Sequence, residues 1–478
     1  MALRFYNTLT QELEVFHPLH DNTVRMYTCG PTVYNFVHIG NFRTFTFQDI
    51  LRRWLRYRGY QLDHVMNVTD VDDKIIINAA KENKSIEEYT AGFTKAFFED
   101  AAALHLEQPE HVALATKHIG DMVAAIEQLA AKGCTYNSEG STYFRIAAFP
   151  EYGKLSHNDF SGIRAGARVD VDEYDKDNAR DFVLWKAKKG DEPYWPTPFG
   201  DGRPGWHIEC SAMAMKYLGQ TLDIHAGGID LVFPHHENEI AQSESISGRP
   251  FARFWLHSEH LHIESQKMSK SLGNFYTLRD LLEMGHQPEA IRYLLAAVPY
   301  RKKLNFTFEG LKAAWRSIER LRDFELRLAS AKLAPGCNEA LSERSREAIR
   351  QFEAGMDDDL NTAEALAAIF EYVRAINTAI DENQFQEENR WEGAKVLELF
   401  DSVFDVLKPY ERPYASAVDG GPELGLSLTD VQIEGLIEER NQAKKSRNFK
   451  RADEIRADLQ EKGILLEDTK DGVRWKRK

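Results

Sequence analysis

Two spacings of apolar residues alternate along the first part of the chain. Residues 23–28 and 61–68 are rich in β-branched and aromatic side chains, which predicts two strands. Between them, residues 42–59 carry apolar side chains three and four positions apart, which predicts a helix. Strand, helix and strand in this order form a βαβ unit. The loop after the first strand then lies where open α/β sheets bind their ligands.

The pattern changes after about residue 110. A predicted helix at 118–132 is followed by short strand-like pieces such as 141–144 and by a charged, glycine-containing stretch at 162–180. We interpret residues 111–180 as an α+β insertion between the two halves of a nucleotide-binding fold. The main fold is expected to resume with a strand at 181–186.

The last third of the chain is predicted to be helical. Apolar residues recur at i, i+3 and i+4 over 311–333 and 342–355, and Asn361 begins a further helix with a variant of the capping box. A stretch with several prolines and glycines, 408–427, is typical of a linker. A small final domain is expected to begin with a helix at 429–447.

Composition places the chain among globular proteins. Its 478 residues are enough for roughly two to four domains, and its contents of 43% apolar and 28% charged residues are ordinary. No apolar run reaches the length of a membrane span, and the first residues do not resemble a signal peptide. We therefore expect a protein of the cytoplasm with no membrane partner.

Charge is distributed unevenly between the chain and its tail. The net charge is −15, so the protein as a whole is a poor general binder of nucleic acid. Residues 431–478, by contrast, hold 13 lysines and arginines against 10 acidic residues. A nucleic-acid site would have to be a local patch, and this tail is either such a patch or a solubilising terminus.

Two short segments have the composition of phosphate-binding loops. In His38-Ile39-Gly40-Asn41, the following helix offers free N–H groups and a partial positive charge to an anion. His38 could donate a hydrogen bond to a phosphate, and Gly40 would let a nucleotide ring lie against the backbone. In Lys267-Met268-Ser269-Lys270-Ser271, two cations and two hydroxyls suit a polyphosphate. Either segment alone also fits an ordinary surface loop.

The cysteines suggest free thiols or metal ligands rather than disulfides, because there are only four and they lie far apart. Cys29 follows the first predicted strand and Cys210 lies far downstream, while His235 and Glu239 share one face of a predicted helix. Two thiolates, an imidazole and a carboxylate would make a zinc site with mixed ligands. His236 with Glu239 is an alternative pair that spacing leaves open.

A polar cluster follows the second predicted strand. Thr69, Asp70, Asp73 and Lys74 fall at a strand's carboxyl end, where ligand contacts are expected. Asp72 and Asp73 equally suit the start of a helix, because acidic residues favour that end. Both interpretations remain open at this point.

Taken in order, the signature segments resemble those of class I aminoacyl-tRNA synthetases. They are His-x-Gly-Asn at 38–41, Phe-Pro-His-His-Glu-Asn-Glu at 233–239 and Lys-Met-Ser-Lys-Ser at 267–271. One departure from the class pattern is Asn41, where many members carry a second histidine. Asparagine is common there in the cysteine enzymes, so we infer no loss of activity from it.

The cysteine-bearing segments are similar to the zinc-bearing segments of cysteinyl-tRNA synthetases. They are Cys-Gly-Pro-Thr-Val-Tyr at 29–34 and Gly-Trp-His-Ile-Glu-Cys-Ser at 205–211. The resemblance covers nearly the whole chain, including the tail at 436–478, which is similar to that family's anticodon-binding end.

The resemblance implies an α/β fold built on a Rossmann-type nucleotide-binding catalytic domain. This domain has an inserted α+β subdomain and is followed by an α-helical bundle and a small C-terminal anticodon-binding domain. The expected segments are 1–110 for the first half of the catalytic domain, 111–180 for the insertion, 181–260 for the second half, 261–307 for a connecting subdomain with the KMSKS loop, 308–407 for the bundle, 408–427 for a linker and 428–478 for the last domain.

The resemblance also implies the reaction. Cysteine and ATP, accompanied by Mg²⁺, give cysteinyl-adenylate and pyrophosphate, and the cysteinyl group then moves to the 3′ end of tRNA-Cys. The residues that match the family's motifs are His38, Asn41, Lys267 and Lys270 for catalysis, Gly40, Gly228, Asp230 and Lys270 for ATP, and Cys29, Thr69 and Trp206 for cysteine. One zinc ion per chain, held by Cys29, Cys210, His235 and Glu239, is expected to bind the substrate thiolate.

Three further expectations concern the rest of the protein. The zinc makes an editing domain unnecessary, and the insertion is too small for one. The family suggests a monomer. On the tRNA side, residues 308–407 are expected at the inner corner, and the tail is expected at the anticodon through Lys444, Lys445, Arg447, Lys450, Arg474 and Trp475.

Three rival functions remain. An ATP-dependent ligase that joins cysteine to a small amine would share the catalytic half but has no need of a basic tail. A non-catalytic RNA-binding paralogue would be expected to have lost His38, Lys270 or a zinc ligand, and all are present. A structural zinc protein would leave both phosphate-binding segments without a role.

Overall fold

The computed structural model describes residues 2–158, 168–169, 181–269, 273–410, 430–445, 448–461, 464–469 and 472–477. The chain divides into two compact units, Met1–Glu411 and Arg412–Lys478. No helix in the described ranges is long and apolar enough to cross a membrane. Lys270, the predicted linker from residue 411 onward and nearly all of the charged stretch at 162–180 lie outside the described residues.

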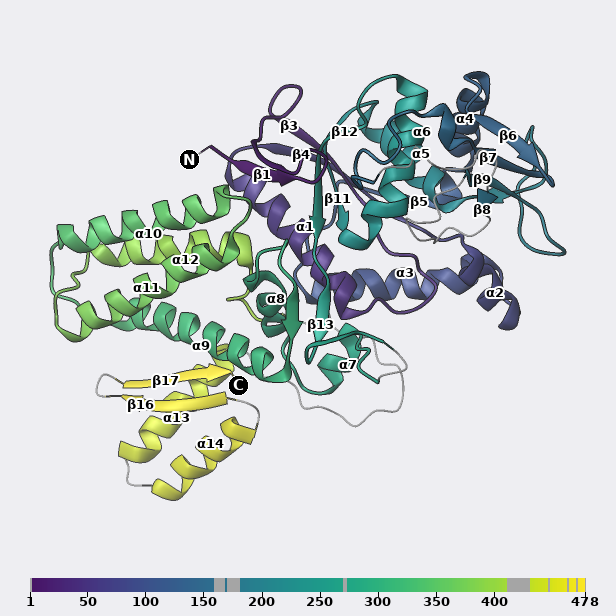
Figure 1. Ribbon diagram of the computed structural model, residues 1–478. Coiled ribbons are helices and arrows are strands. Elements are labelled where there is room, and N and C mark those ends of the chain that lie inside the picture. Colours follow the sequence, from purple (N-terminus) through teal and green to yellow (C-terminus); the bar gives the residue numbers. More distant parts are fainter. Residues whose placement is uncertain are drawn as a thin grey trace. The chain divides into compact units, whose positions relative to one another are not determined.

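A five-stranded parallel sheet forms the centre of the first unit (Figure 1). The strand order is β12-β11-β3-β4-β5, so the chain starts in the middle and builds outward on both sides. The expected Rossmann-type α/β fold is confirmed. In such a sheet, ligands bind at the carboxyl edge where the order reverses, here between β3 and β11. The strands are β3 (Thr23–Thr28), β4 (Gln61–Val68), β5 (His111–Leu114), β11 (Leu222–Gly228) and β12 (Ala252–Ser258).

Helices cover both faces of this sheet. Val24 and Met26 of β3 enter one core with α1, while Tyr27 enters a second core with α4, α5 and α6. Because both faces are buried, the central strands are apolar on both sides, as is usual in parallel sheets. The helices are α1 (Ile39–Tyr57), α2 (Asp73–Lys81), α3 (Ile86–Ala103), α4 (Ile119–Ala131), α5 (Trp206–Leu218) and α6 (Glu237–Ser247).

Local sequence patterns located the first elements well. The strands predicted at 23–28 and 61–68 are β3 and β4, and before them β1 (Arg4–Asn7) pairs antiparallel with β2 (Glu12–Val15). The predicted helix begins earlier than expected, at Ile39, because the side chain of His38 caps it by accepting a hydrogen bond from the Asn41 N–H.

The predicted edges of the insertion are wrong at both ends. His111–Leu114 is β5, which pairs with β4 in the parallel sheet and therefore belongs to the main fold. Asp181–Ala187 is β9, which pairs with β7 in a separate sheet and does not resume the main fold. That second sheet has the order β10-β9-β7-β6 with β8 beside β9, formed by β6 (Thr135–Ser138), β7 (Ser141–Phe144), β8 (Arg168–Val169), β9 and β10 (Gly202–Pro204).

A small three-stranded sheet follows β12. Its order is β14-β13-β15, with β13 (Leu261–Ile263), β14 (Gln266–Lys267) and β15 (Leu304–Phe306). Helices α7 (Leu278–Glu283) and α8 (Pro288–Ala297) lie between β14 and β15 in the chain. The segment therefore carries the described part of the second loop predicted to bind phosphate.

The remainder of the first unit is helical, as predicted. Its helices are α9 (Phe308–Ser330), α10 (Glu339–Asp357), α11 (Thr362–Asp381) and α12 (Asn389–Phe404). Each buries one apolar face in a core that is continuous with the α1 side of the parallel sheet. Asn361 accepts a hydrogen bond from the Glu364 N–H and so begins α11.

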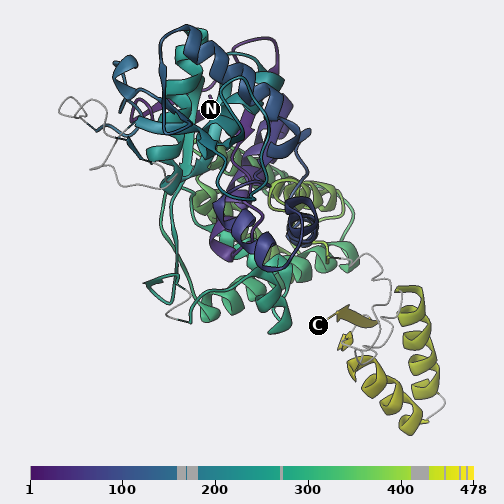
Figure 2. The same cartoon turned by 90° about the vertical axis from the view of Figure 1, so that its right-hand side faces the viewer.

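The second unit consists of two helices and a hairpin. Figures 1 and 2 both show α13 (Asp430–Lys445) beside α14 (Phe449–Glu461), and β16 (Ile464–Thr469) pairs antiparallel with β17 (Gly472–Arg477). Ile455, Leu459, Ile464 and Leu466 form its core, and Trp475 packs against them. The predicted helix at 429–447 is therefore confirmed as α13.

One buried arginine joins three parts of the first unit. Arg292 of α8 is fully buried and donates to the Asp49 carboxylate of α1 at 2.5 Å. It also donates to the carbonyl oxygens of Phe404, at the end of α12, and of Leu104, after α3. Burial alone would raise the pKa of Asp49, but Arg292 and then Arg53 hold it below its ordinary value.

We expect the substitution Arg292→Met to lower the free energy of unfolding by about 3–5 kcal/mol, because it leaves the buried Asp49 charge with a partner missing. Arg346→Met is the matched control, because Arg346 is 46% exposed and pairs with Glu339 and Glu343 of its own helix and, at 4.0 Å, with Glu392 of α12. The control substitution should lower the free energy of unfolding by less than about 1 kcal/mol. Urea unfolding monitored by fluorescence measures both, and equal losses would contradict the assignment.

Candidate functional site

A cleft of about 540 Å³ opens at the carboxyl edge of β3 and β11. Its walls come from the loop after β3, the start of α1, the start of α2, the first residue of α5 and the turn after β11. Predicted site residues that line it are Cys29, His38, Asn41, Trp206, Gly228 and Asp230. Residues that were predicted from widely separated segments therefore share one cavity, as the switch point of the sheet requires.

The N-terminus of α1 faces this cleft. His38 is its N-cap, and because the Nδ1 atom accepts the Asn41 N–H at 3.2 Å, the neutral ring carries its proton on Nε2. A Cβ atom on Gly40 would lie 3.0 Å from the His38 ring and 3.1 Å from Met268 Cε, so a side chain there would crowd both. The helix start thus combines backbone N–H groups, a partial positive charge and an imidazole donor.

The described ends of the lysine-containing loop lie against the same helix start. The Ile39 N–H donates to the Tyr276 carbonyl at 2.9 Å, and the His38 ring contacts the edge of Phe275. Asn274 joins the two ends, because it accepts from the Ser269 N–H and donates to the Lys267 carbonyl. Lys267 is exposed, and Lys270 lies outside the described residues.

Four predicted metal ligands meet below the cleft. One donor atom from each of Cys29, Cys210, His235 and Glu239 can be chosen so that all four lie within 4.8 Å of one another. Each of the four residues is buried. Tetrahedral zinc with ligands at about 2.0–2.3 Å has ligand atoms about 3.3–3.8 Å apart, so the group is compact enough for one ion.

The charges in this group suit a cation. Burial opposes ionisation of Cys210, but a hydrogen bond from Cys29 and the nearby His235 lower the pKa of Cys210 to about 6. Burial likewise opposes ionisation of Glu239, but His225 and His235 hold its pKa at about 2. Both shifts favour the charged forms of Cys210 and Glu239, whereas burial raises the pKa of Cys29 well above its ordinary value. Buried charges are paired or coordinate a metal, and two sulfur atoms, an imidazole and a carboxylate in one compact group fit a zinc-type ion.

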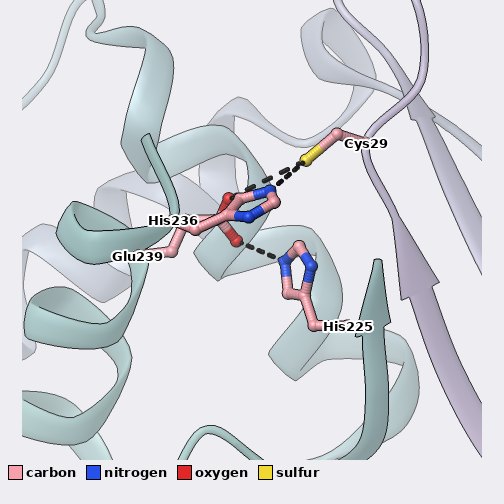
Figure 3. A group of neighbouring side chains, drawn as sticks. All are labelled: Cys29, His225, His236 and Glu239. Carbon is pink, nitrogen blue, oxygen red and sulfur yellow. Dashed lines mark hydrogen bonds and ion pairs between the residues drawn. The ribbon is translucent and has the colours of Figure 1, made fainter. Parts of the chain in front are cut away.

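A second combination of ligands shares two of these residues. Cys29, His225, His236 and Glu239 also offer donor atoms within 4.8 Å of one another (Figure 3). His225 Nε2 lies 2.8 Å from Glu239 Oε2, and His236 Nε2 lies 3.3 Å from Cys29 Sγ. Burial, followed by repulsion from neighbouring histidines, lowers the pKa of His236 well below its ordinary value. The two combinations overlap at Cys29 and Glu239, so the choice between His235 and His236 left open by spacing persists in the geometry.

Not all of the predicted pocket residues line the cleft. Trp206 lines the cleft and stacks on the His235 ring, with ring centroids 4.1 Å apart. Thr69 is 1% exposed and does not line the cleft. Its hydroxyl instead donates a hydrogen bond to Glu209 at 2.9 Å. Gly228 ends β11 and Asp230 lies in the turn that follows, where a Cβ atom on Gly228 would be only 2.4 Å from the Asp230 carboxylate.

The polar cluster after β4 serves both suggested purposes. Asp72 caps α2 by accepting the Ile75 N–H, while Asp72, Asp73 and Lys74 line the cleft. Asp70 instead accepts two hydrogen bonds from Thr116. The acidic residues therefore begin a helix and also face the cleft.

Sequence reasoning missed several histidines around the metal group. His225 lies on β11, His257 on β12 and His207 on α5, and all three are buried. His207 contacts His235 through their Nδ1 atoms at 2.9 Å, and His257 contacts His236 at 2.8 Å. The available signal was a histidine within each of two largely apolar strands, since a buried polar residue needs a partner.

Comparison with known proteins places the chain among tRNA synthetases. The family described as the class I (C) tRNA synthetase catalytic domain matches residues 15–316, and the DALR domain family matches residues 351–408. Curated relatives named cysteine–tRNA ligase are 62% identical in Solibacter usitatus and 54% identical in Koribacter versatilis. Each alignment covers 100% of this chain and 100% of the relative.

Solved structures resemble the fold at low identity. A Mycobacterium tuberculosis methionyl-tRNA synthetase in complex with methionyl-adenylate is similar with a TM-score of 0.60 at 14% identity, over 80% of this chain and 90% of that chain. A putative arginyl-tRNA synthetase from Campylobacter jejuni has a TM-score of 0.54, also at 14% identity, over 81% and 94%. At this identity the likeness shows the fold alone.

We expect Cys210→Ser to abolish stoichiometric zinc binding, because a hydroxyl is a poor ligand for this ion. Cys134→Ser is the matched control, because Cys134 is also buried but lies outside both ligand combinations. Equilibrium dialysis under reducing conditions, followed by elemental analysis, should give about one zinc per chain for the wild type and the control. Full zinc content in Cys210→Ser would contradict the assignment.

Proposed function

From the premise that this chain belongs to the cysteine–tRNA ligase family of class I aminoacyl-tRNA synthetases, we propose which of its residues activate and select cysteine. The protein is an ATP-dependent ligase with cysteine, ATP and tRNA as substrates. The observation that carries the proposal is the single cleft that has Cys29 and Trp206 at its walls together with His38, Asn41 and Asp230. An amino acid held near Cys29 and a nucleotide held at the start of α1 would meet inside it.

The first step of the proposed reaction is attack of the cysteine carboxylate on the α-phosphorus of ATP. This step needs alignment and charge stabilisation more than covalent help from the protein. The His38 Nε2–H and the N–H groups at the start of α1 would stabilise the α-phosphate, next to Asn41. Gly40 would let the nucleotide approach the backbone, and Gly228 with Asp230 would hold the ribose.

The lysines of the second loop would stabilise the leaving pyrophosphate, together with Mg²⁺ that accompanies ATP. Asn274 supports this role because it fixes Lys267 and Ser269 beside the start of α1. Lys270 is assigned by its match to the family's motif. The cysteinyl group would then move to the 3′ end of tRNA-Cys.

Selection of cysteine is proposed to depend on zinc held by Cys29, Cys210, His235 and Glu239. Zinc bound there would offer a thiolate a site that a hydroxyl group occupies far less well. Rejection of serine by ~10⁴ requires about 5–6 kcal/mol, more than packing provides against the change of one atom. Cys29 supports this proposal because it both lines the cleft and belongs to the metal group. Trp206 would wall the pocket, and no editing domain would be needed.

Recognition of tRNA is proposed to use both units. The helices α9 to α12 would contact the inner corner of tRNA-Cys, and the second unit would contact the anticodon through cations that include Lys444 and Lys450. The side chains of Lys445 and Arg474 and the whole of Arg447 lie outside the described residues. Trp475 packs against the core of its unit, so its proposed role is limited to the part of the ring that remains exposed. We also propose a monomer that acts in the cytoplasm.

The direct test is transfer of labelled cysteine to purified tRNA-Cys with ATP, with serine run in parallel. We expect charging with cysteine and a discrimination of ~10⁴ or more against serine. Cysteine-dependent pyrophosphate exchange without tRNA charging would overturn the proposal in favour of a ligase for a small amine. Comparable charging with serine would overturn the selection mechanism alone.

We further expect His38→Gln to lower kcat for cysteine-dependent pyrophosphate exchange by about 10²–10³, as for loss of a donor that acts in the transition state. The KM for cysteine should change little, since His38 does not belong to the metal group. His20→Gln is the control, because His20 is exposed and does not line the cleft. A raised KM for cysteine with unchanged kcat would place His38 in cysteine binding instead.

A further inference from the structure

Two cysteines of the metal group lie on segments that are far apart in the chain. Cys29 follows β3, and Cys210 lies in the first half of α5. Groups that orient metal ligands from outside the coordination shell raise the affinity of a site for its ion. Contacts that hold the loop after β3 against α5 would therefore favour metal binding by the two cysteines.

Hydrogen bonds hold the loop after β3 against the end of β4. The Gly30 N–H donates to Asn67 Oδ1 at 2.9 Å, and the Thr69 N–H donates to the Pro31 carbonyl at 3.0 Å. The approach is so close that a Cβ atom on Gly30 would lie 1.8 Å from the Asn67 carbonyl oxygen. Only glycine fits there, and the position of its neighbour Cys29 is thereby set by β4.

The end of β4 is in turn hydrogen-bonded to α5. Asn67 Nδ2 donates to Thr69 Oγ1 at 3.1 Å, and the Thr69 hydroxyl donates to Glu209 Oε2 at 2.9 Å. Asn67, Thr69 and Glu209 are each at most 2% exposed. The direction of every bond is fixed, because the Asn67 oxygen is engaged by Gly30 and a carboxylate can only accept. Glu209 immediately precedes Cys210.

We propose that Asn67, Thr69 and Glu209 form a buried hydrogen-bonded chain that positions Cys29 and Cys210 for the metal. None of the three lines the cleft or belongs to either combination of metal ligands. They are positioning residues, and the part of Thr69 in cysteine binding is indirect. The inference depends on the proposed zinc site, and it assigns to Thr69 a role different from direct contact with the substrate.

The first test compares Thr69→Val with Thr69→Ser in the full-length protein. Valine has the shape of threonine but removes the hydroxyl, whereas serine keeps it. The zinc dissociation constant is measured by competition with a chromophoric chelator, with no cysteine or ATP present. We expect Thr69→Val to weaken zinc binding by about 10–100-fold, as is typical of groups that orient metal ligands. Thr69→Ser should restore binding to within about threefold of wild type, since it keeps both hydrogen bonds.

Thr90→Val is the matched control, because Thr90 is also a buried threonine but donates to a backbone carbonyl within α3. It should leave the zinc affinity unchanged, which separates the effect from loss of any buried hydroxyl. A second pair of variants, Glu209→Met and Glu209→Gln, repeats the comparison at the other end of the series of hydrogen bonds. Glutamine keeps an acceptor for Thr69 and methionine does not, so only methionine should weaken zinc binding.

Steady-state kinetics then separate positioning from general damage. In Thr69→Val the KM for cysteine should rise at subsaturating zinc and recover at high zinc, while the KM for ATP should stay within about twofold of wild type. Wild-type zinc affinity in both Thr69→Val and Glu209→Met would overturn the inference, even if the KM for cysteine rose. Failure of the wild type to bind zinc would instead overturn the proposed zinc site, and this inference with it.

Discussion

A carboxylate that is fully removed from water organises the centre of this protein. Glu239 is 0% exposed, and its two oxygens lie 2.8 Å from His225 and 3.0 Å from His235. Burial of an unpaired carboxylate would cost several kcal/mol, so the surrounding strands must supply partners. Those partners, His225 and His235, come from β11 and from the turn before α6. His207 of α5 in turn contacts His235, and His257 of β12 contacts His236, so several histidines gather around one carboxylate in an otherwise apolar interior.

The same constraint links the core of the sheet to the cleft. Cys29 belongs to the buried group and also lines the cavity that extends to His38. Parallel strands make this possible, because the loops after β3 and β11 leave the same edge of the sheet on either side of the switch point. The buried group of candidate metal ligands and the N-terminus of α1 are therefore parts of one edge of the fold.

Sequence patterns predicted the elements that depend on neighbouring residues, and they missed the contacts that join residues far apart in the sequence. β3 and β4 follow from local propensity and were located closely, whereas the start of α1 was placed at residue 42 because the cap formed by His38 was not predicted. The strand at Asp181–Ala187 was recognised but assigned to the wrong sheet, because strand-forming residues do not specify their partner. Motif spacing brought out Cys29, Cys210, His235 and Glu239, which the structure places together. His225 and His257 were not predicted, because single histidines within strands carry no spacing signal. The hydrogen bond from Thr69 to Glu209 was not predicted either, because it joins residues 140 positions apart.

We propose above all that the buried group binds a metal, which in turn binds the thiolate of the substrate. X-ray absorption spectroscopy at the zinc edge measures this directly, because it counts the sulfur neighbours of the ion. We expect two sulfur neighbours in the zinc-loaded enzyme, contributed by Cys29 and Cys210, and a third when cysteine is added but not when serine is added. A count that stays at two in the presence of saturating cysteine would contradict direct binding of the thiolate by the metal.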